Sequence, residues 1–219
     1  MARHAEKRVA AEAAARLVED GMRVGLGTGS TVALLLPALA ARGLALRCVA
    51  TSPATEQAAR ELGLEVEPFA GPDALDRVDI AIDGADQVAP SGWLVKGGGA
   101  AHTREKAVAA AADRFVVVVS SDKLVERLAP PVPLELLEYG LASTLRRVDG
   151  VELREAPRSP DGNVIADYTA QFDDPEALAA TLSATVGVVE HGLFPAALVS
   201  DVVIGRGGQV EHRSFRPAG

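Results

Sequence analysis

The chain of 219 residues is 48% hydrophobic and 24% charged, with a formal net charge of −8 at pH 7. This acidic balance argues against a general nucleic-acid-binding protein, which would present a basic face, although it leaves room for a small basic pocket. The first residues are charged where a signal peptide would be apolar, and no run approaches the roughly 20 apolar residues of a membrane span. We therefore expect a soluble, cytoplasmic protein that binds neither nucleic acid nor membrane.

The first half of the chain alternates between helical and strand patterns. In chain order these are helix 5–20, strand 22–26, helix 32–41, strand 44–50, helix 53–62, strand 64–68, strand 78–82, helix 103–112 and strand 114–120. The strands are nearly continuous apolar runs, which is typical of a parallel sheet covered on both faces. The sequence therefore predicts an α/β fold, a Rossmann-like parallel sheet with helices on both faces.

The pattern changes at the proline cluster 129–133, which is typical of a domain hinge. After it we expect helix 135–146, strand 151–154, a turn at 159–163, strand 164–168, helix 175–182, strand 186–190, an apolar strand 197–204 and a tight turn at 205–208. The segment after the prolines suits a small α+β domain with helices on one face of an antiparallel sheet.

A glycine-rich loop, Gly27-Thr28-Gly29-Ser30-Thr31, joins the first strand to the next helix. Glycines let the backbone approach a ligand, and the N–H groups at a helix start favour phosphate. A nicotinamide cofactor is disfavoured, because Ser30 stands where the dinucleotide fingerprint has its third glycine and residues 50–52 contain no acid. The alternative is an ordinary strand-to-helix turn capped by Ser30 or Thr31.

Charged residues then gather around further glycines. Asp83 and Asp86 end a buried strand, Lys96 begins a run of three glycines, and Glu105 lies just inside the following helix. Singly, these residues suit a turn, a solvated charge and a first-turn acid. Together, we expect them at the carboxyl ends of parallel strands, where open α/β sheets bind ligands. The grouping indicates a site that moves protons and holds an anion.

Three motifs carry a resemblance that spans nearly the whole chain. Gly-Thr-Gly-Ser-Thr (27–31), Asp-Gly-Ala-Asp (83–86) and Lys-Gly-Gly-Gly-Ala-Ala-x-Thr-Arg-Glu-Lys (96–106) resemble, in this order, the type A family of ribose-5-phosphate isomerases. Lys7 and Lys123 extend the match, with weaker echoes at 162–167, 187–194 and 201–205. The resemblance implies an aldose–ketose isomerase of the non-oxidative pentose phosphate pathway, working on ribose 5-phosphate and ribulose 5-phosphate through a cis-enediolate, without metal or organic cofactor.

The resemblance also implies a role for each matching residue. Glu105 would take the C2 proton and return it at C1, with Lys96 and the N–H groups of Gly97, Gly98 and Gly99 facing the enediolate oxygen. Asp83 and Asp86 would hold sugar hydroxyls and assist ring opening, with Gly84 and Ala85 between them. The phosphate would be held by Thr28, Gly29, Ser30, Thr31, Lys7 and Lys123.

The same resemblance implies the domain plan and the assembly. Residues 1–129 and 199–219 would form the catalytic α/β domain. Residues 130–198 would form a smaller α+β domain, ferredoxin- or ACT-like, inserted before the C-terminal strand. The partner is a small sugar phosphate, and a homodimer or homotetramer is expected.

Some residues depart from the family pattern or lie outside its motifs. Residues 134–139 stand where the family has a Val-Glu-Val-type strand, and His191 precedes Gly-Leu-Phe, where a small polar residue is common. His102 is expected to be a loop residue near the site, and Cys48 a buried, inert thiol. No two histidines have metal-ligand spacing, so no metal site is expected.

Three alternatives share this type of fold. An amino-sugar-phosphate deaminase-isomerase would need its own catalytic histidine and a longer chain, and a coenzyme A transferase would use its glutamate covalently. A sugar-phosphate-sensing domain of a transcription regulator would need a DNA-binding module in front, whereas one helix precedes the first strand here. A sensor would also have no need of Glu105.

Overall fold

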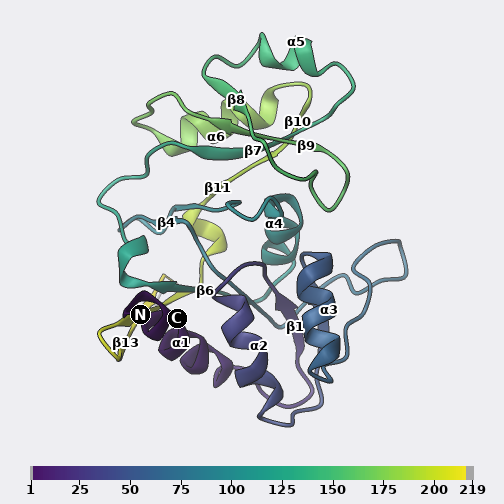
Figure 1. Ribbon diagram of the computed structural model, residues 1–219, viewed down its shortest axis with the longest axis vertical. Helices are drawn as coiled ribbons and strands as arrows, with labels where there is room; N and C mark the ends of the chain where they lie inside the picture. Colours follow the sequence, from purple (N-terminus) through teal and green to yellow (C-terminus); the bar gives the residue numbers. More distant parts are fainter. Residues whose placement is uncertain (1, 216–219) are drawn as a thin grey trace.

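The computed structural model describes residues 2–215. Its larger part is built on a six-stranded sheet in the order β13-β12-β6-β3-β1-β2 (Figure 1). Five strands are parallel, and β13 pairs antiparallel with β12 at one edge. The strands are β1 (Arg23–Leu26), β2 (Arg47–Ala50), β3 (Ile80–Asp83), β6 (Phe115–Ser120), β12 (Asp201–Arg206) and β13 (Gln209–Ser214).

Helices cover both faces of this sheet, as predicted. They are α1 (Ala2–Ala15), α2 (Val32–Ala40), α3 (Pro53–Glu61) and α4 (His102–Ala110). In β6, Val116 and Val118 pack in the core that contains α1 and α2, whereas Val117 packs with Val108 of α4. This division follows from the alternation of side chains along a strand. Among residues 2–215, no helix combines the length and apolarity needed to cross a bilayer.

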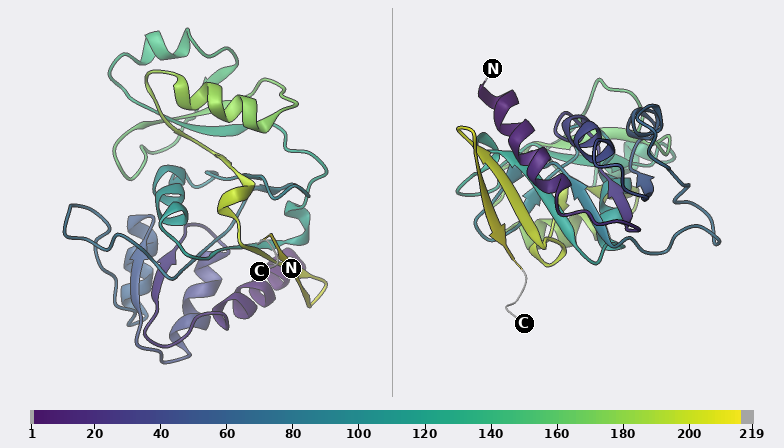
Figure 2. Two further views of the ribbon diagram at one scale, coloured as in Figure 1. Left: turned by 180° about the vertical axis from the view of Figure 1, so that it is seen from behind. Right: turned by 90° about the horizontal axis from the view of Figure 1, so that it is seen from below.

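The small α+β domain is also present, inserted between β6 and β12. Its strands β7 (Val132–Leu136), β8 (Val151–Leu153), β9 (Val164–Tyr168) and β10 (Val188–His191) form an antiparallel sheet in the order β10-β7-β9-β8. The helices α5 (Leu141–Leu145) and α6 (Pro175–Ala184) share one apolar cluster with β7, through Leu141, Leu182 and Leu134. Figure 2 shows this domain stacked on the larger one. The boundaries at 129/130 and 198/199 stay predictions.

A third, small sheet that the sequence did not predict joins the two parts. It consists of β4 (Gln87–Val88), β5 (Leu94–Val95) and β11 (Leu193–Phe194), in the order β11-β5-β4. Just beyond it, the Lys96 N–H donates to the Gly192 carbonyl at 2.8 Å, and the Gly192 N–H donates to the Pro133 carbonyl at 2.7 Å. The short 3₁₀ segments η1 (Ser121–Lys123) and η2 (Ala196–Leu198) complete the connections.

The predicted helix 135–146 is wrong over its first half. Residues 132–136 form the strand β7, and helix is confined to Leu141–Leu145. Glu135, a charged residue at the start of the predicted helix, is fully buried. Its carboxylate accepts hydrogen bonds from Ser159 at 2.6 Å and Asn163 at 2.7 Å. These partners lie more than 20 residues away in the chain, so local periodicity could not reveal them.

Two other strand predictions need correction. The predicted strand 64–68 contributes only the single bridge between Val66 and Cys48, because the chain leaves the edge of the sheet there. The apolar run 197–204 begins with η2, so β12 starts at Asp201. The segment after the turn at Gly207-Gly208 is not a short tail but β13, which pairs with β12 over six residues.

Candidate active site

A cavity of about 210 Å³ opens where β1, β3 and β6 reach their carboxyl ends. Its lining residues come from five segments of the chain and include every predicted site residue except Asp83. They are Lys7, Thr28, Gly29, Ser30, Thr31, Gly84, Ala85, Asp86, Lys96, Gly97, Gly98, Gly99, Glu105, Val119, Ser120 and Lys123. Val119 and Ser120 were not predicted. They could have been predicted, because they end the parallel strand β6, and this end lies at the same edge of the sheet as the loops after β1 and β3.

At the base of this cavity, two buried carboxylates share one buried ammonium. Lys96 Nζ lies 2.8 Å from Asp83 Oδ2 and 3.1 Å from Glu105 Oε2, and it donates to the Gly84 carbonyl at 2.6 Å. The three residues are each 4% exposed or less. Lys96 is therefore not the solvated charge that its position in a glycine loop would allow. Among the described residues, Oε2 of Glu105 accepts no hydrogen bond of good geometry, although the Lys96 ammonium lies 3.1 Å from it.

Asp83 lies behind the cavity and holds the first two loops together. Its Oδ1 accepts hydrogen bonds from the Gly84 N–H at 2.7 Å and the Thr28 N–H at 3.1 Å. This contact requires glycine at position 27, because a Cβ there would lie 2.0 Å from the Asp83 carboxylate. The glycine loop is thus fixed to the end of β3 by a carboxylate that reaches across from the neighbouring strand.

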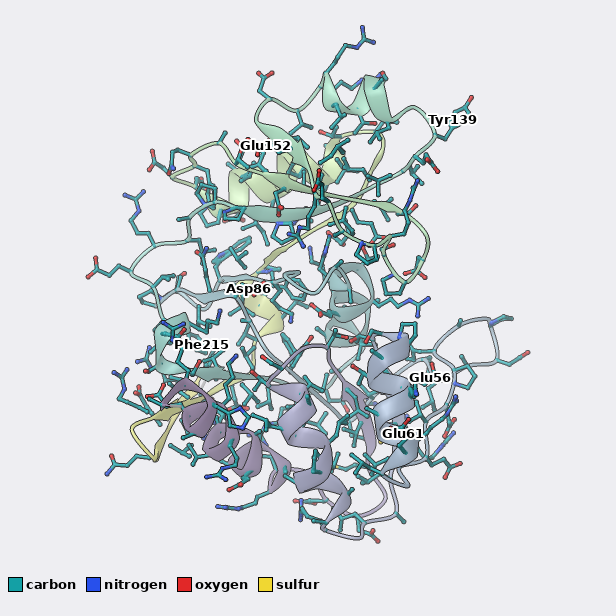
Figure 3. All side chains as sticks on the ribbon, viewed as in Figure 1. Glu56, Glu61, Asp86, Tyr139, Glu152 and Phe215 are labelled. Carbon is teal, nitrogen blue, oxygen red and sulfur yellow. The ribbon has the colours of Figure 1, made fainter. Side chains whose placement is uncertain are left out.

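The loop of residues 96–99, here called the lysine loop, follows a strand that the sequence did not predict. It follows β5, which pairs antiparallel in the small third sheet, so the expectation of a third parallel-strand end is wrong. Gly97 has φ +105°, a conformation that suits glycine. The Gly98 N–H donates to Asp86 Oδ2 at 2.8 Å. Figure 3 places Asp86 in the middle of the molecule, where the two domains meet.

Burial and the ratio of two carboxylates to one ammonium determine the pKa values of Asp83, Lys96 and Glu105. Burial raises the pKa of Glu105 to about 8; Asp83 adds to the rise, while Lys96 opposes it. Burial likewise raises the pKa of Asp83, against the pull of Lys96. Burial by itself would lower the pKa of Lys96, but Asp83 and Glu105 together raise it. One ammonium cannot balance two buried carboxylates, so Glu105 takes up a proton more readily than a solvated glutamate.

The other side of the cavity is suited to an anion. Lys7 Nζ donates to the Ser30 hydroxyl at 2.9 Å, and Lys123 lines the same wall. Gly29 adopts φ +112° in the turn before α2. Thr31 makes no side-chain capping hydrogen bond to α2. Two ammonium groups, hydroxyls and a helix start therefore converge here, a combination that favours phosphate.

Two residues outside the cavity, His102 and Cys48, complete the account of the sequence predictions. His102 is not in a loop: it begins α4, is fully buried, and its Nε2 lies 3.3 Å from the Glu190 carbonyl. Burial lowers its pKa to about 4. Cys48 is fully buried, as predicted, and burial raises its pKa to about 12. Among residues 2–215, no group of three or more His, Cys, Asp and Glu side chains is placed to hold a metal ion.

Comparison with known proteins gives one consistent answer. The sequence model of the family "Ribose 5-phosphate isomerase A (phosphoriboisomerase A)" matches residues 47–209. A ribose-5-phosphate isomerase A from Caulobacter vibrioides is 46% identical over 205 residues, covering 86% of this chain and 89% of the relative. One from Halorubrum lacusprofundi is 46% identical over 224 residues, covering 92% of both chains.

Solved structures agree with the sequence relatives. Ribose 5-phosphate isomerase A from Methanocaldococcus jannaschii superimposes with a TM-score of 0.87 at 32% identity, covering 95% of this chain and 97% of that one. A D-ribose-5-phosphate isomerase in complex with phospho-erythronic acid gives 0.89 at 33% identity, covering 98% and 100%. Extended identity, a matching fold and the motif residues around one cavity all lead to the same conclusion. The chain belongs to the ribose 5-phosphate isomerase A family.

Proposed function

We propose that this protein interconverts ribose 5-phosphate and ribulose 5-phosphate, the activity of the family to which it belongs, with Glu105 as the base. One observation carries the proposal. A buried glutamate with a raised pKa borders the cavity beside the Lys96 ammonium. Lys7, Ser30 and Lys123, here called the phosphate cradle, line the same cavity. A base, a facing cation and a phosphate site are the three elements that an aldose–ketose isomerisation needs.

The reaction moves one proton between neighbouring carbons and has no net redox partner. Ionised Glu105 removes the proton from C2 of the open-chain aldose, and the electrons move onto the C1 oxygen to give a cis-enediolate. The same carboxyl group then delivers the proton to C1, while the proton of the C2 hydroxyl passes to the C1 oxygen and the C2 oxygen becomes a carbonyl. The Lys96 ammonium stabilises the negative charge that develops on oxygen, which a buried, fixed cation does well.

The remaining side chains are assigned from their positions around the cavity. Lys7, Ser30 and Lys123 would hold the phosphate at the end of the cavity formed by the turn before α2. Asp86 lines the cavity; its Oδ2 accepts from the Gly98 N–H, and its Oδ1 would meet a sugar hydroxyl. Direct contact between Asp83 and the sugar stays a prediction. Its present contacts support a role in holding Lys96 and the loops.

The ligand of one similar structure supports the assignment of substrate class. That isomerase was determined in complex with phospho-erythronic acid, a phosphorylated sugar acid. We infer that this cavity takes a ligand of the same chemistry, with the phosphate against Lys7 and Lys123 and the polar end against Lys96. The cavity is lined by Lys7 and Lys123, which suit the phosphate, and by Lys96, which suits the other anionic group of such a ligand.

Replacement of the base tests the proposed chemistry. For Glu105→Gln we expect turnover of ribose 5-phosphate to fall by about 1,000-fold or more, with KM nearly unchanged, because general-base catalysis contributes up to about 10,000-fold. The matched control is Glu61→Gln, which changes an exposed acid on α3. The measurements are ribulose 5-phosphate formation and exchange of the transferred proton with deuterated water.

The outcomes separate an enzyme from a sensor. If the wild-type protein binds the sugar phosphate but neither it nor the variant turns it over, a sugar-phosphate-sensing domain explains the cavity better. If Glu105→Gln loses binding and keeps its turnover number, the glutamate belongs to ligand binding rather than to proton transfer.

The assembly and location also stay proposals. Apolar side chains of the small domain are exposed, with Tyr139 at 95%, Val186 at 74% and Leu137 at 45%. Tyr139 points outward from this domain in Figure 3. We propose that this surface, which contains Leu137, Tyr139 and Val186, contributes to a homodimer or homotetramer. Light scattering would measure the assembly. A cytoplasmic location is the corresponding expectation for the cell.

A further inference from the structure

The small domain reaches into the site through one side chain. Arg154 lies just after β8, and its Nη1 donates to the carbonyls of Gly97 at 3.1 Å and Gly98 at 3.3 Å. The other edge of its guanidinium group meets the carboxylate of Asp167 on β9, with Nε to Oδ2 at 2.9 Å. Both side chains are about four-fifths buried, at 21% and 20% exposed. Arg154 is thus fixed by its own domain and directed at the lysine loop.

These contacts determine which way the loop's N–H groups point. In a trans peptide the carbonyl and the following N–H point in opposite directions. With the carbonyls of Gly97 and Gly98 facing Arg154, the N–H groups of Gly98 and Gly99 face away from it. The Gly98 N–H indeed donates to Asp86 Oδ2 at 2.8 Å. Gly99 lines the cavity, and by the same geometry its N–H points away from Arg154.

Such a loop needs an external support. Three consecutive glycines have the largest conformational freedom of any sequence, and without Cβ atoms they cannot be held by side-chain packing. Donors that stabilise developing negative charge act strongly only when they are already oriented before the reaction. The planar guanidinium fork can bind a carboxylate with two parallel N–H groups along one edge and carbonyls along another, a rigid planar geometry that an ammonium group does not have.

We propose that Arg154 is a positioning residue for the isomerisation: from the small domain it holds the peptide groups that link residues 97–99, so that the Gly98 N–H stays on Asp86 and the Gly99 N–H faces the enediolate. This inference rests on the proposed function. Arg154 does not line the cavity and acts through the loop. The small domain is then part of the catalytic apparatus and not merely a surface for assembly.

The test compares kcat, KM and anion binding in the full-length protein. For Arg154→Gln we expect kcat to fall by about 10- to 100-fold, while KM and the inhibition constant of inorganic phosphate change by less than about threefold, since the phosphate cradle is untouched. The matched control is Arg158→Gln, because Arg158 pairs with Glu138 on the exposed surface of the same domain. That control should keep the wild-type kcat.

A second variant separates positioning from folding. In Arg154→Ala, free guanidinium ion at low millimolar concentration should restore part of the lost kcat, which no loss of folded protein would allow. The inference is overturned if kcat stays at the wild-type value in Arg154→Gln. It is equally overturned if phosphate affinity falls as much as kcat, because the whole site would then have collapsed. If the wild-type protein itself shows no turnover, the proposed function fails instead, and the two failures are distinguishable.

Discussion

Two neighbouring residues of α4, Glu105 and Lys106, belong to two different clusters of buried charge. The first cluster, Asp83–Lys96–Glu105, borders the cavity, whereas the second, Lys106–Glu190–His191, lies between α4 and the small domain. Both clusters touch the ring of Phe194, whose centroid is 5.3 Å from Lys96 Nζ and 5.0 Å from Lys106 Nζ. They differ in the balance of charge.

The second cluster is balanced. Lys106 Nζ lies 2.6 Å from Glu190 Oε1 and donates to the His191 carbonyl at 2.7 Å. Burial would raise the pKa of Glu190, but Lys106 holds it below its usual value. Burial also lowers the pKa of His191 to about 4, so the imidazole stays neutral. One cation faces one anion, and the cluster does not border the catalytic cavity.

The first cluster is unbalanced, with two carboxylates for one ammonium, and it opens on a cavity. Burial raises the pKa of Glu105, the charge of Asp83 raises it further, and the opening gives a substrate access to the carboxylate. The comparison teaches that burial of charge alone does not mark a reactive site. The balanced pair Lys106–Glu190 stabilises the contact between α4 and the small domain. We expect proton transfer at Glu105, which has a raised pKa and borders a cavity.

Replacing the lysine of each cluster in turn is the strongest test of the difference between the two clusters. For Lys96→Met we expect turnover to fall by about 1,000-fold, because the cation facing the enediolate is lost. For Lys106→Met we expect turnover to stay within about threefold, but the free energy of unfolding to fall by on the order of 3 kcal/mol, because Glu190 is left unpaired in a largely buried position. Steady-state kinetics and urea unfolding measure the two effects. Equal losses of turnover in both variants would contradict the division.

The pH dependence of kcat/KM should report the raised pKa of Glu105. The base must be ionised, so we expect kcat/KM to fall about tenfold per pH unit below a midpoint near pH 8. Asp86 also raises the pKa of Glu105, so Asp86→Asn should move the midpoint to lower pH. A profile that stays flat between pH 5 and 9 is the result that would refute the raised pKa.

Glu105 and the buried His102, both on α4, should influence stability in opposite pH directions. The folded pKa of Glu105 is about 8, above its ordinary 4.5, so its contribution to the free energy of unfolding declines as the pH rises between these values. His102 has a folded pKa of about 4, below its ordinary 6.5, so its contribution is lost as the pH falls from 6.5 to 4. We expect His102→Leu to flatten the loss of stability at acid pH in urea titrations.

Chelation should have the smallest effect. In the first cluster the positive charge beside Glu105 comes from Lys96, and the family resemblance implies no metal. We therefore expect full turnover after dialysis against EDTA. A loss of activity that a divalent cation restores would show that the ammonium does not supply all of the charge stabilisation.

The sequence was sufficient for the parts of the molecule that depend on local pattern. The apolar run at Phe115–Ser120 can only be a central strand, and Ser52 followed by Pro53 begins a helix as predicted. The motif residues, with Lys7 and Lys123, also named the cavity lining apart from Val119 and Ser120, because glycine loops and strand ends follow simple topological rules. Asp83 is the predicted residue that turned out to lie behind the cavity.

Other features depended on partners that are distant in the chain. Residues 135–146 were predicted to be a helix. In the structure Glu135 lies in a strand, where Ser159 and Asn163 donate hydrogen bonds to its buried carboxylate. Arg154 carried no local signal, because its contacts with Gly97 and Gly98 span more than 50 residues. The sequence by itself determined the elements, the family and most of the groups around the cavity. Tertiary structure decided which charges are buried together and in what ratio, because desolvation and pairing act between side chains that only folding brings into contact.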